Sequence, residues 1–238
     1  MDSIPETHPG GSRITGVGVL DRCVALLNLL SGGPQSLRAL ADASGLPRPT
    51  AHRLLVALEA HRLVARDGSG SFRLGPRLTE LAARAGPELD LAGASGPVLT
   101  RLHAATGESV QLYVRSGDRR LCIATRDAGT GLRDSVPLGA LLPLDVGSGG
   151  KVLLAWSADG ANVPDLAAVR SRGWAESVAE REPGVASVSA PIMRDGVLIA
   201  ALCVSGPVSR LGQAPGRKLS ALVVAAAAQL SGQVAGPR

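Results

Sequence analysis

The stretch LPRPTAHRLLVALEAHRLV, residues 46–64, gathers polar side chains at one end of an otherwise apolar helical pattern. Arg48, Thr50, His52 and Arg53 fall in its first turn. An arginine can pair with guanine O6 and N7 in the major groove of DNA, and a hydroxyl or imidazole can reach a base edge or a phosphate. The residue types therefore indicate nucleic-acid reading, and the alternative is a helix end that only faces water.

Basic residues continue beyond this helix. Arg66 and Arg73 flank the turn DGSG at 67–70, which separates two short alternating runs and predicts a β-hairpin. Across residues 44–77 six arginines face two acidic residues, a net charge of +4. Such an excess is expected of a phosphate-binding surface, and a solvated basic face is the equally weighted alternative.

A second group of small polar side chains lies in the C-terminal half. Ser187, Ser189, Cys203 and Ser205 alternate with apolar residues along two expected strands, so they share one face of a sheet. They can line a polar pocket or simply bond to their neighbours. The residues alone favour local hydrogen bonds.

The sequence contains no complete enzyme motif. The stretch GSGGK at 147–151 fails as a P-loop because Asp145 and Val152 replace the required glycine and hydroxyl residue. No G-x-S-x-G motif occurs, and His103 has no nearby partner for a catalytic triad. The three cysteines are too widely spaced to suggest a zinc site or a disulfide framework. We therefore expect no catalytic residue, no cofactor and no metal.

The elements that position the basic residues come in a recognisable order. Apolar residues from Val19 to Leu30 predict a first helix, and Ser36 is the expected N-cap of a second. A turn at 44–47 precedes the third helix, with Pro49 at its first position, and the hairpin follows. This order predicts a winged helix-turn-helix, in which the start of the third helix enters the major groove and the hairpin meets the DNA backbone or minor groove.

Helical spacing also predicts which apolar residues face inward. The expected inward set on the first helix is Leu20, Cys23, Val24, Leu27 and Leu30. The expected inward set on the third helix is Ala51, Leu54, Leu55 and Leu58.

The rest of the chain alternates between helical and strand patterns. Residues 77–85 predict a connecting helix, and Pro97–Ala105 predicts another with Ser95 as its cap. Two hairpins are expected, the first from strands at 110–114 and 121–125 and the second from strands at 185–193 and 197–204. A final helix should cover 218–234. These elements predict an α+β domain, an antiparallel sheet with helices on one face.

Composition limits the classes of function. The chain has 238 residues, 45% of them hydrophobic, which is ample for buried cores. Only four residues are aromatic, which argues against base stacking on single strands. The net charge is +5, and no apolar run is long enough to span a membrane, so we expect a cytoplasmic protein without a membrane partner.

Several motifs, in order, resemble the IclR family of transcriptional regulators over residues 16–234. They are GVGVLDRCVALLNLL, LRALADASGLPRPTAHRLLVAL, FRLGPRL, RLHAATGESVQLYV, SVPLGALLPLDVGSGGKVLLA, RGWAESVAEREPGVASVSAPI and VLIAALCVSGPVSRL. The wording of the last motifs is most similar to an actinobacterial branch linked to leucine and other amino-acid metabolism.

The resemblance implies a two-domain α+β protein, a winged helix-turn-helix followed by a GAF-like effector domain with an antiparallel sheet. We accordingly divide the chain into a flexible tail (1–15), a DNA-binding domain (16–76), a linker helix (77–90) and an effector-binding domain (91–238). It implies dimers or tetramers on a near-palindromic DNA operator, with affinity set by a small metabolite.

The resemblance also assigns site residues by position. The expected DNA-contacting residues are Ser36, Arg48, Pro49, Thr50, His52, Arg53, Arg66 and Arg73. The expected effector-binding residues are Ser148, Gly149, Ser177, Ser187, Cys203 and Ser205. Family members often carry Asp and Cys where this chain has Ser177 and Ser187, which argues against a metal-assisted or strongly charge-selective pocket. The alternatives are a winged-helix module that docks on proteins, or one fused to an enzymatic domain.

Overall fold

The computed structural model divides the chain into two compact units, Met1–Ala85 and Gly86–Arg238, which we describe separately. It describes residues 15–82, 84, 87–127, 129, 134–160 and 163–234. Apart from Thr15, the expected tail of residues 1–15 lies outside the described residues. No helix among these residues is long and apolar enough to cross a membrane.

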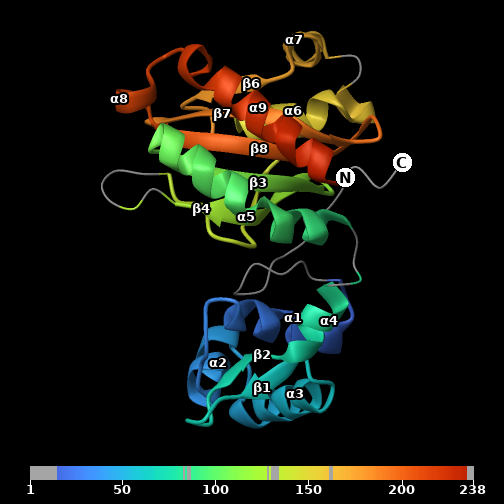
Figure 1. Cartoon of the computed structure of the whole chain (residues 1–238). Helices are drawn as coiled ribbons and strands as arrows, with labels where there is room; N and C mark the ends of the chain where they lie inside the picture. The colour runs from blue at the N-terminus through green and yellow to red at the C-terminus, as the bar shows by residue number, and fades with distance from the viewer. Residues whose placement is uncertain are drawn as a thin grey trace, which may run out of the picture. The chain divides into compact units, whose positions relative to one another are not determined.

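The N-terminal unit has the predicted order of three helices and a hairpin (Figure 1). Its elements are α1 (Gly18–Leu30), α2 (Leu37–Ser44), α3 (Arg48–Ala60), β1 (Val64–Arg66), β2 (Phe72–Leu74) and α4 (Pro76–Ala82). Ser36 is the N-cap of α2, as predicted, and its hydroxyl oxygen accepts a hydrogen bond from the Ala39 N–H at 3.2 Å. Gly45 ends that helix with a left-handed backbone, which costs glycine nothing.

The three helices and the hairpin enclose one small core. It consists of Leu26, Leu30, Leu40, Leu55, Leu58, Val64 and Phe72. The predicted inward face of α3 is confirmed at Ala51, Leu55 and Leu58, while Leu54 is half-buried.

The predicted inward face of α1 is confirmed at Leu30, with Cys23 and Leu27 half-buried against the core, but it is wrong at Leu20 and Val24. Leu20 is 53% exposed and Val24 is also exposed, whereas Leu26 and Leu30 are buried. Apolar residues cover most sides of α1, so spacing alone fits two overlapping stripes. Asp21 is buried beside Thr15, whose N–H and hydroxyl both donate to its carboxylate.

The C-terminal unit is built on a six-stranded antiparallel sheet with the strand order β5-β4-β3-β8-β7-β6 (Figure 1). The strands are β3 (Ser109–Ser116), β4 (Arg119–Arg126), β5 (Leu141–Pro143), β6 (Ala175–Val178), β7 (Val185–Arg194) and β8 (Val197–Pro207). The two predicted hairpins, β3–β4 and β7–β8, are confirmed. Edge strands β5 and β6 were not predicted, because three or four residues give almost no periodic signal.

Helices cover both faces of this sheet, so the prediction of helices on one face is wrong. The helices are α5 (Pro87–Thr106), α6 (Gly147–Ala155), α7 (Pro164–Arg172), α8 (Val208–Leu211) and α9 (Gly216–Val234), with a short 3-10 turn at Ala158–Gly160. Residues of α5 and α9 share one apolar core with the sheet, and those of α6 and α7 share a second on the opposite face (Figure 1). The central strands are buried on both sides, which requires cover on both.

Helix α5 begins ten residues before the predicted start at Pro97. Pro97 lies inside the helix, and Ser95 is no cap, because its hydroxyl donates to the Ala92 carbonyl one turn earlier at 2.9 Å. Leu91 is fully buried in the core and holds the early turns against the sheet. Packing therefore overrides the local tendency of proline to begin a helix.

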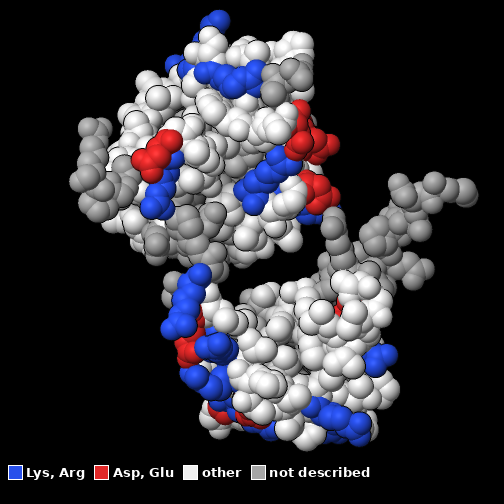
Figure 2. All heavy atoms as spheres, turned by 90° about the vertical axis from the view of Figure 1, so that its right-hand side faces the viewer, with Lys and Arg blue, Asp and Glu red and all other residues white. Residues whose placement is uncertain are grey.

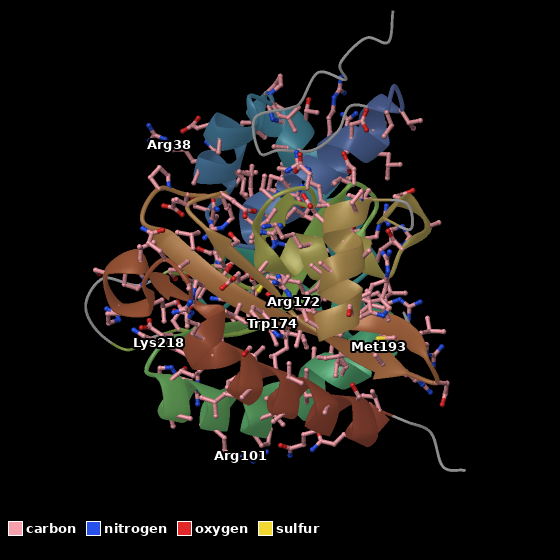
Figure 3. The ribbon with its side chains drawn as sticks, turned by 90° about the horizontal axis from the view of Figure 1, so that it is seen from above. Arg38, Arg101, Arg172, Trp174, Met193 and Lys218 are labelled. Carbon is pink, nitrogen blue, oxygen red and sulfur yellow. The ribbon has the colours of Figure 1, made fainter. Side chains whose placement is uncertain are left out.

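The start of α9 is tied to the far edge of the sheet. Glu176 of β6 accepts a hydrogen bond from the Gly216 N–H at 2.8 Å, and Gly216 packs so closely on Trp174 that a side chain would collide. The guanidinium of Arg172 lies over the Trp174 ring, 4.2 Å from the ring centre (Figure 3). The opposite face of β6 is thereby left to form the site described below.

Candidate nucleic-acid interface and ligand cavity

The first turn of α3 presents the predicted polar side chains to the outside. Arg48, Pro49, His52 and Arg53 are exposed, and Thr50 is half-buried. The helix begins at Arg48, so Pro49 stands at the second helical position and not, as predicted, at the first. At either position proline wastes no hydrogen bond, because the first N–H groups of a helix have no internal partner.

Arg48, His52 and Arg53 make no ion pair within the described part of the chain. Their donors point outward from a helix N-terminus, which itself carries partial positive charge. Figure 2 shows basic side chains along the left and lower edges of the N-terminal unit in that view, with acidic ones between some of them. This surface can bind a polyanion.

The two arginines of the hairpin differ in their surroundings. Arg66 donates from Nε to Glu59 Oε2 at 3.2 Å and lies 4.5 Å from the ring centre of Phe72. Arg73 has only a marginal contact, 3.5 Å from Nη1 to the Leu74 carbonyl. Arg73 is thus available to a partner, whereas Arg66 is partly committed to holding the hairpin against α3.

The hairpin turn is held by one carboxylate. Asp67 Oδ1 accepts hydrogen bonds from the Ser69 N–H, the Ser69 hydroxyl and the Ser71 N–H, at 2.7 to 3.0 Å. The Ser69 hydroxyl is the main cause of a lowered pKa at Asp67. The turn between the two arginines therefore has a defined shape.

In the C-terminal unit, the six predicted effector-binding residues converge on one small cavity. Ser148 and Gly149 come from the start of α6, Ser177 from β6, and the remaining three from β7 and β8. The full lining is Tyr113, Arg120, Asp134, Gly147, Ser148, Gly149, Ser177, Arg181, Glu182, Val185, Ser187, Cys203 and Ser205. The structure thus brings together all six positions that the resemblance selected.

Hydroxyl groups form the floor of this cavity. The Ser148 hydroxyl lies 2.7 Å from that of Ser187 and 2.8 Å from that of Ser189. The Ser205 hydroxyl donates to Gln111 Oε1 at 3.0 Å. Local hydrogen bonding and cavity lining, which the sequence analysis treated as alternatives, therefore both occur here.

The glycines of the P-loop-like stretch bring α6 close to the sheet. A Cβ on Gly150 would lie 2.0 Å from the Leu144 carbonyl oxygen, and one on Gly149 would lie 3.1 Å from the Tyr113 ring. Gly147 has a φ of +81°, which a larger residue adopts only with strain. The glycines thus serve close packing, and they place the N-terminus of α6 at the cavity.

A buried arginine that the sequence analysis missed stands beside this helix N-terminus. Arg120 of β4 is 3% exposed, and its Nη1 donates to the carbonyls of Pro143 and Val146, the latter at 2.6 Å. Its guanidinium lies 5.3 Å from the Tyr113 ring centre. The Arg120 Nε is buried with no hydrogen-bond partner among the described residues. Burial lowers the pKa of Arg120, so an anion placed here would relieve an electrostatic cost.

Further charged residues border the cavity. Arg181 donates to Asp134, and both side chains are largely buried. Burial alone would lower the pKa of Arg181, but the hydrogen bond and the charge of Asp134 outweigh it and raise that pKa. The lining therefore contains two arginines and two acidic residues besides the serines.

A signal for Arg120 was present in the sequence but needed a strand register. Arg120 and Cys122 point to the same face of β4, and that face is buried. A charged residue at an inward-facing position of a strand is a candidate functional residue, because charged side chains are rarely buried without a partner. Arg119, Arg126 and Arg115 mask this signal, because they make the whole segment look like an exposed edge.

Within the described residues, no cluster of His, Cys, Asp and Glu could hold a metal ion.

Comparison with family models covers most of the chain. The IclR helix-turn-helix domain matches residues 19–68. The bacterial transcriptional regulator IclR C-terminal domain matches residues 84–163 and 162–232.

Curated relatives are similar over most of their length. The chain is 29% identical over 223 residues to the HTH-type transcriptional repressor AllR of Escherichia coli K12, covering 82% of each protein. It is 28% identical over 242 residues to the HTH-type transcriptional regulator BhcR of Paracoccus denitrificans, covering 91% of this chain and 87% of that protein. These relatives are transcriptional regulators.

Solved structures share the fold. An IclR homologue from Microbacterium hydrocarbonoxydans, complexed with 4-hydroxybenzoate, matches with a TM-score of 0.73 and 22% identity, over 91% of this chain and 98% of that one. The IclR protein of Thermotoga maritima matches with a TM-score of 0.68 and 21% identity, also over 91% and 98%.

Proposed function

The chain belongs to the IclR family of bacterial transcriptional regulators, and from that premise we propose how its residues divide the work. Residues 16–76 bind operator DNA, and residues 91–238 bind the metabolite that adjusts this binding. Residues 77–90 join the two. The convergence of six predicted residues on one cavity, beside a buried and partly unpaired arginine, is the observation that carries the ligand-binding part.

In the DNA-binding part, Arg53 and Arg48 read bases from the major groove, and Thr50 and His52 contact bases or phosphates. Ser36 and Pro49 approach the backbone at the starts of α2 and α3. Arg73 of the hairpin contacts phosphate, and Arg66 contributes mainly by holding the hairpin on α3, since Glu59 and Phe72 already engage it.

The effector is a small metabolite with an acidic group. Arg120 offers a buried charge and a spare Nε donor, and the start of α6 adds N–H groups at the positive end of a helix dipole. The hydroxyls of Ser148 and Ser187 would receive a second polar group. The fold relative that binds 4-hydroxybenzoate, an aromatic carboxylate, supports this chemistry.

The active species is a dimer or tetramer on a near-palindromic operator. Exposed apolar side chains of α1, including Val19 and Leu20, favour contact with a second copy. The effector shifts the oligomer between arrangements that bind the operator well and poorly. From the wording of the C-terminal motifs, we assign its target genes to amino-acid metabolism, leucine in particular.

A mobility-shift assay with the region upstream of the gene itself tests the DNA-binding part. We expect retention that weakens steeply with salt, and no comparable retention of a scrambled duplex. Arg53→Ala should weaken this retention and relax the base preference, whereas Arg101→Ala, which removes an outward-pointing arginine of α5 (Figure 3), should do neither. Absence of any salt-sensitive retention would contradict the proposal.

A further inference from the structure

The cavity is too small for any metabolite in the conformation described. Its volume is about 20 Å³, room for about one water molecule, whereas small-molecule sites are on the order of hundreds of Å³. If this cavity receives the effector, as proposed above, part of its wall must move first. The question is which part.

The connection between β6 and β7, residues 179–184, is one wall segment of the cavity. It carries Arg181 and Glu182 into the lining and contains no helix or strand. Its two ends are fixed by hydrogen bonds, Ala179 N–H to the Val185 carbonyl at 2.8 Å and Val208 N–H to the Gly184 carbonyl at 2.7 Å.

Between those ends, side chains tie the segment down at two places. Arg181 donates to Asp134, which belongs to the chain just before β5, and the two side chains are 19% and 6% exposed. Glu180 receives hydrogen bonds from Lys151 and, at 3.1 Å, from the Gly147 N–H at the start of α6. Ionic contacts with two separate parts of the unit, Asp134 and helix α6, therefore hold the segment against the cavity. The segment has no large apolar side chain that could anchor it in the core.

The Glu180 carboxylate also occupies the position where an anion would bind. It takes a hydrogen bond from the first residue of α6, next to Ser148 and Gly149 of the cavity. An acidic ligand would compete with it for this helix N-terminus and with Asp134 for Arg181. Closure and ligand binding thus use the same cationic groups.

We propose that residues 179–184 form a flap that gates the cavity, latched by the Arg181–Asp134 and Glu180–Lys151 ion pairs, and that an acidic ligand opens it by exchanging with the latch carboxylates. Ala179 and Gly184, which bound the segment, both have left-handed backbone, with φ of +57° and +82°. The inference rests on the proposed function in treating this cavity as the effector site.

The chain carries its own reporter of flap opening. Cys203 lines the cavity floor and is 4% exposed, and Cys122, 1% exposed, lies on the neighbouring part of the sheet but not in the lining. Burial raises the pKa of both thiols, so both are slow to react in the closed protein. Opening of the flap exposes Cys203 alone, whereas unfolding of the unit exposes both.

The test measures alkylation of the full-length chain by iodoacetamide, with the rate at each cysteine read by peptide mass spectrometry. Arg181→Gln and Asp134→Asn should each raise the Cys203 rate roughly tenfold without changing the Cys122 rate. The double variant should be no faster than the faster single variant, because both changes open one latch. Arg115→Gln, which breaks the exposed Arg115–Asp159 pair elsewhere in this unit, should change neither rate.

Equal rises at Cys203 and Cys122 would overturn the proposal, because they would report unfolding of the whole unit. An unchanged Cys203 rate in both latch variants would also overturn it. If these variants fail to fold, Glu180→Gln, at a more exposed latch carboxylate, should give the same selective rise in a smaller amount. The labelling needs neither DNA nor effector, so its failure is distinguishable from failure of operator binding in the mobility-shift assay.

Discussion

The two units handle their arginines in opposite ways. On α3 and the hairpin tip, Arg48, Arg53 and Arg73 are exposed and make no ion pair among the described residues. In the C-terminal unit, Arg120 and Arg181 are buried to a large extent and are held by carbonyls and a carboxylate. Exposed, unpaired cations suit a polyanion, which needs only to displace salt ions from solution. Buried cations suit one small anion, which must displace the partner that already holds them inside the protein.

The largest expected effect is on the stability of the C-terminal unit, where glycines bring α6 close to the sheet. Gly150→Ala should lower the free energy of unfolding of the C-terminal unit by about 3 kcal/mol, because its Cβ would collide with the Leu144 carbonyl. Both tryptophans, Trp156 and Trp174, lie in this unit, so their fluorescence during urea unfolding reports it alone.

Gly232→Ala is the matched control, in helix α9 with no atom near its added Cβ. It should leave stability unchanged or raise it by up to about 1 kcal/mol. Equal behaviour of the two variants would show that the glycines do not bring α6 against the sheet.

On the exposed side, Arg53→Ala should cost about 1–3 kcal/mol of operator binding and relax base preference at one position of each half-site. The physical reason is the loss of a bidentate contact to guanine. Competition binding with single-base variants of the operator measures it. An equal loss of affinity for every operator variant would contradict base reading and would indicate that Arg53 contacts a phosphate.

A third prediction uses pH to separate the buried groups. Burial raises the pKa of Cys122 to about 12, from an ordinary value near 9.0. The folded unit therefore keeps this proton when the unfolded chain has lost it, and stability should fall as pH rises from about 9 towards 12. Tryptophan-monitored unfolding should show a shallower alkaline fall in Cys122→Ala, with Cys23→Ala as control. An identical alkaline fall in both would contradict a buried, protonated Cys122.

The smallest expected effect distinguishes the two hairpin arginines. Arg73→Ala should reduce the slope of log affinity against log salt by about 1, because one phosphate contact is lost. Arg66→Ala should reduce that slope by less, since Glu59 already pairs with this arginine. Arg66→Ala should instead lower the thermal stability of the N-terminal unit. Equal slope changes would show that the Arg66–Glu59 pair opens on DNA.

The same contrast explains what could be predicted from the sequence. The exposed reading surface follows from local patterns: Ser36 caps a helix, leucines bury one side of α3, and the polar first turn is left outside. The order of helices and hairpin needed no long-range information. On α1, where apolar residues cover most sides, spacing also selected two exposed residues, Leu20 and Val24.

The cavity depends on contacts that are distant in sequence. Ser148 and Cys203 meet because β7 and β8 pack under α6; alternation had placed Cys203 on a shared sheet face, but only the resemblance had pointed to Ser148. Arg120 and Asp134 were missed because nothing local marks a charge that the fold will bury. The two edge strands and the early start of α5 were missed for the same reason, since packing and not periodicity defines them.

The measurement that tests the central claim most directly is operator affinity with and without small acids, in three forms of the full chain. Fluorescence anisotropy would compare the unaltered chain with Arg120→Met and Arg53→Ala, against a panel of amino acids, keto acids, hydroxy acids and 4-hydroxybenzoate. We predict that at least one acid changes operator affinity of the unaltered chain. Arg120→Met should bind the operator normally but ignore that acid, and Arg53→Ala should bind the acid normally, by thermal shift, but bind the operator more weakly by about 1–3 kcal/mol. An acid response that survives in Arg120→Met, or an operator affinity that is unchanged in Arg53→Ala, would contradict the division of work between the two units.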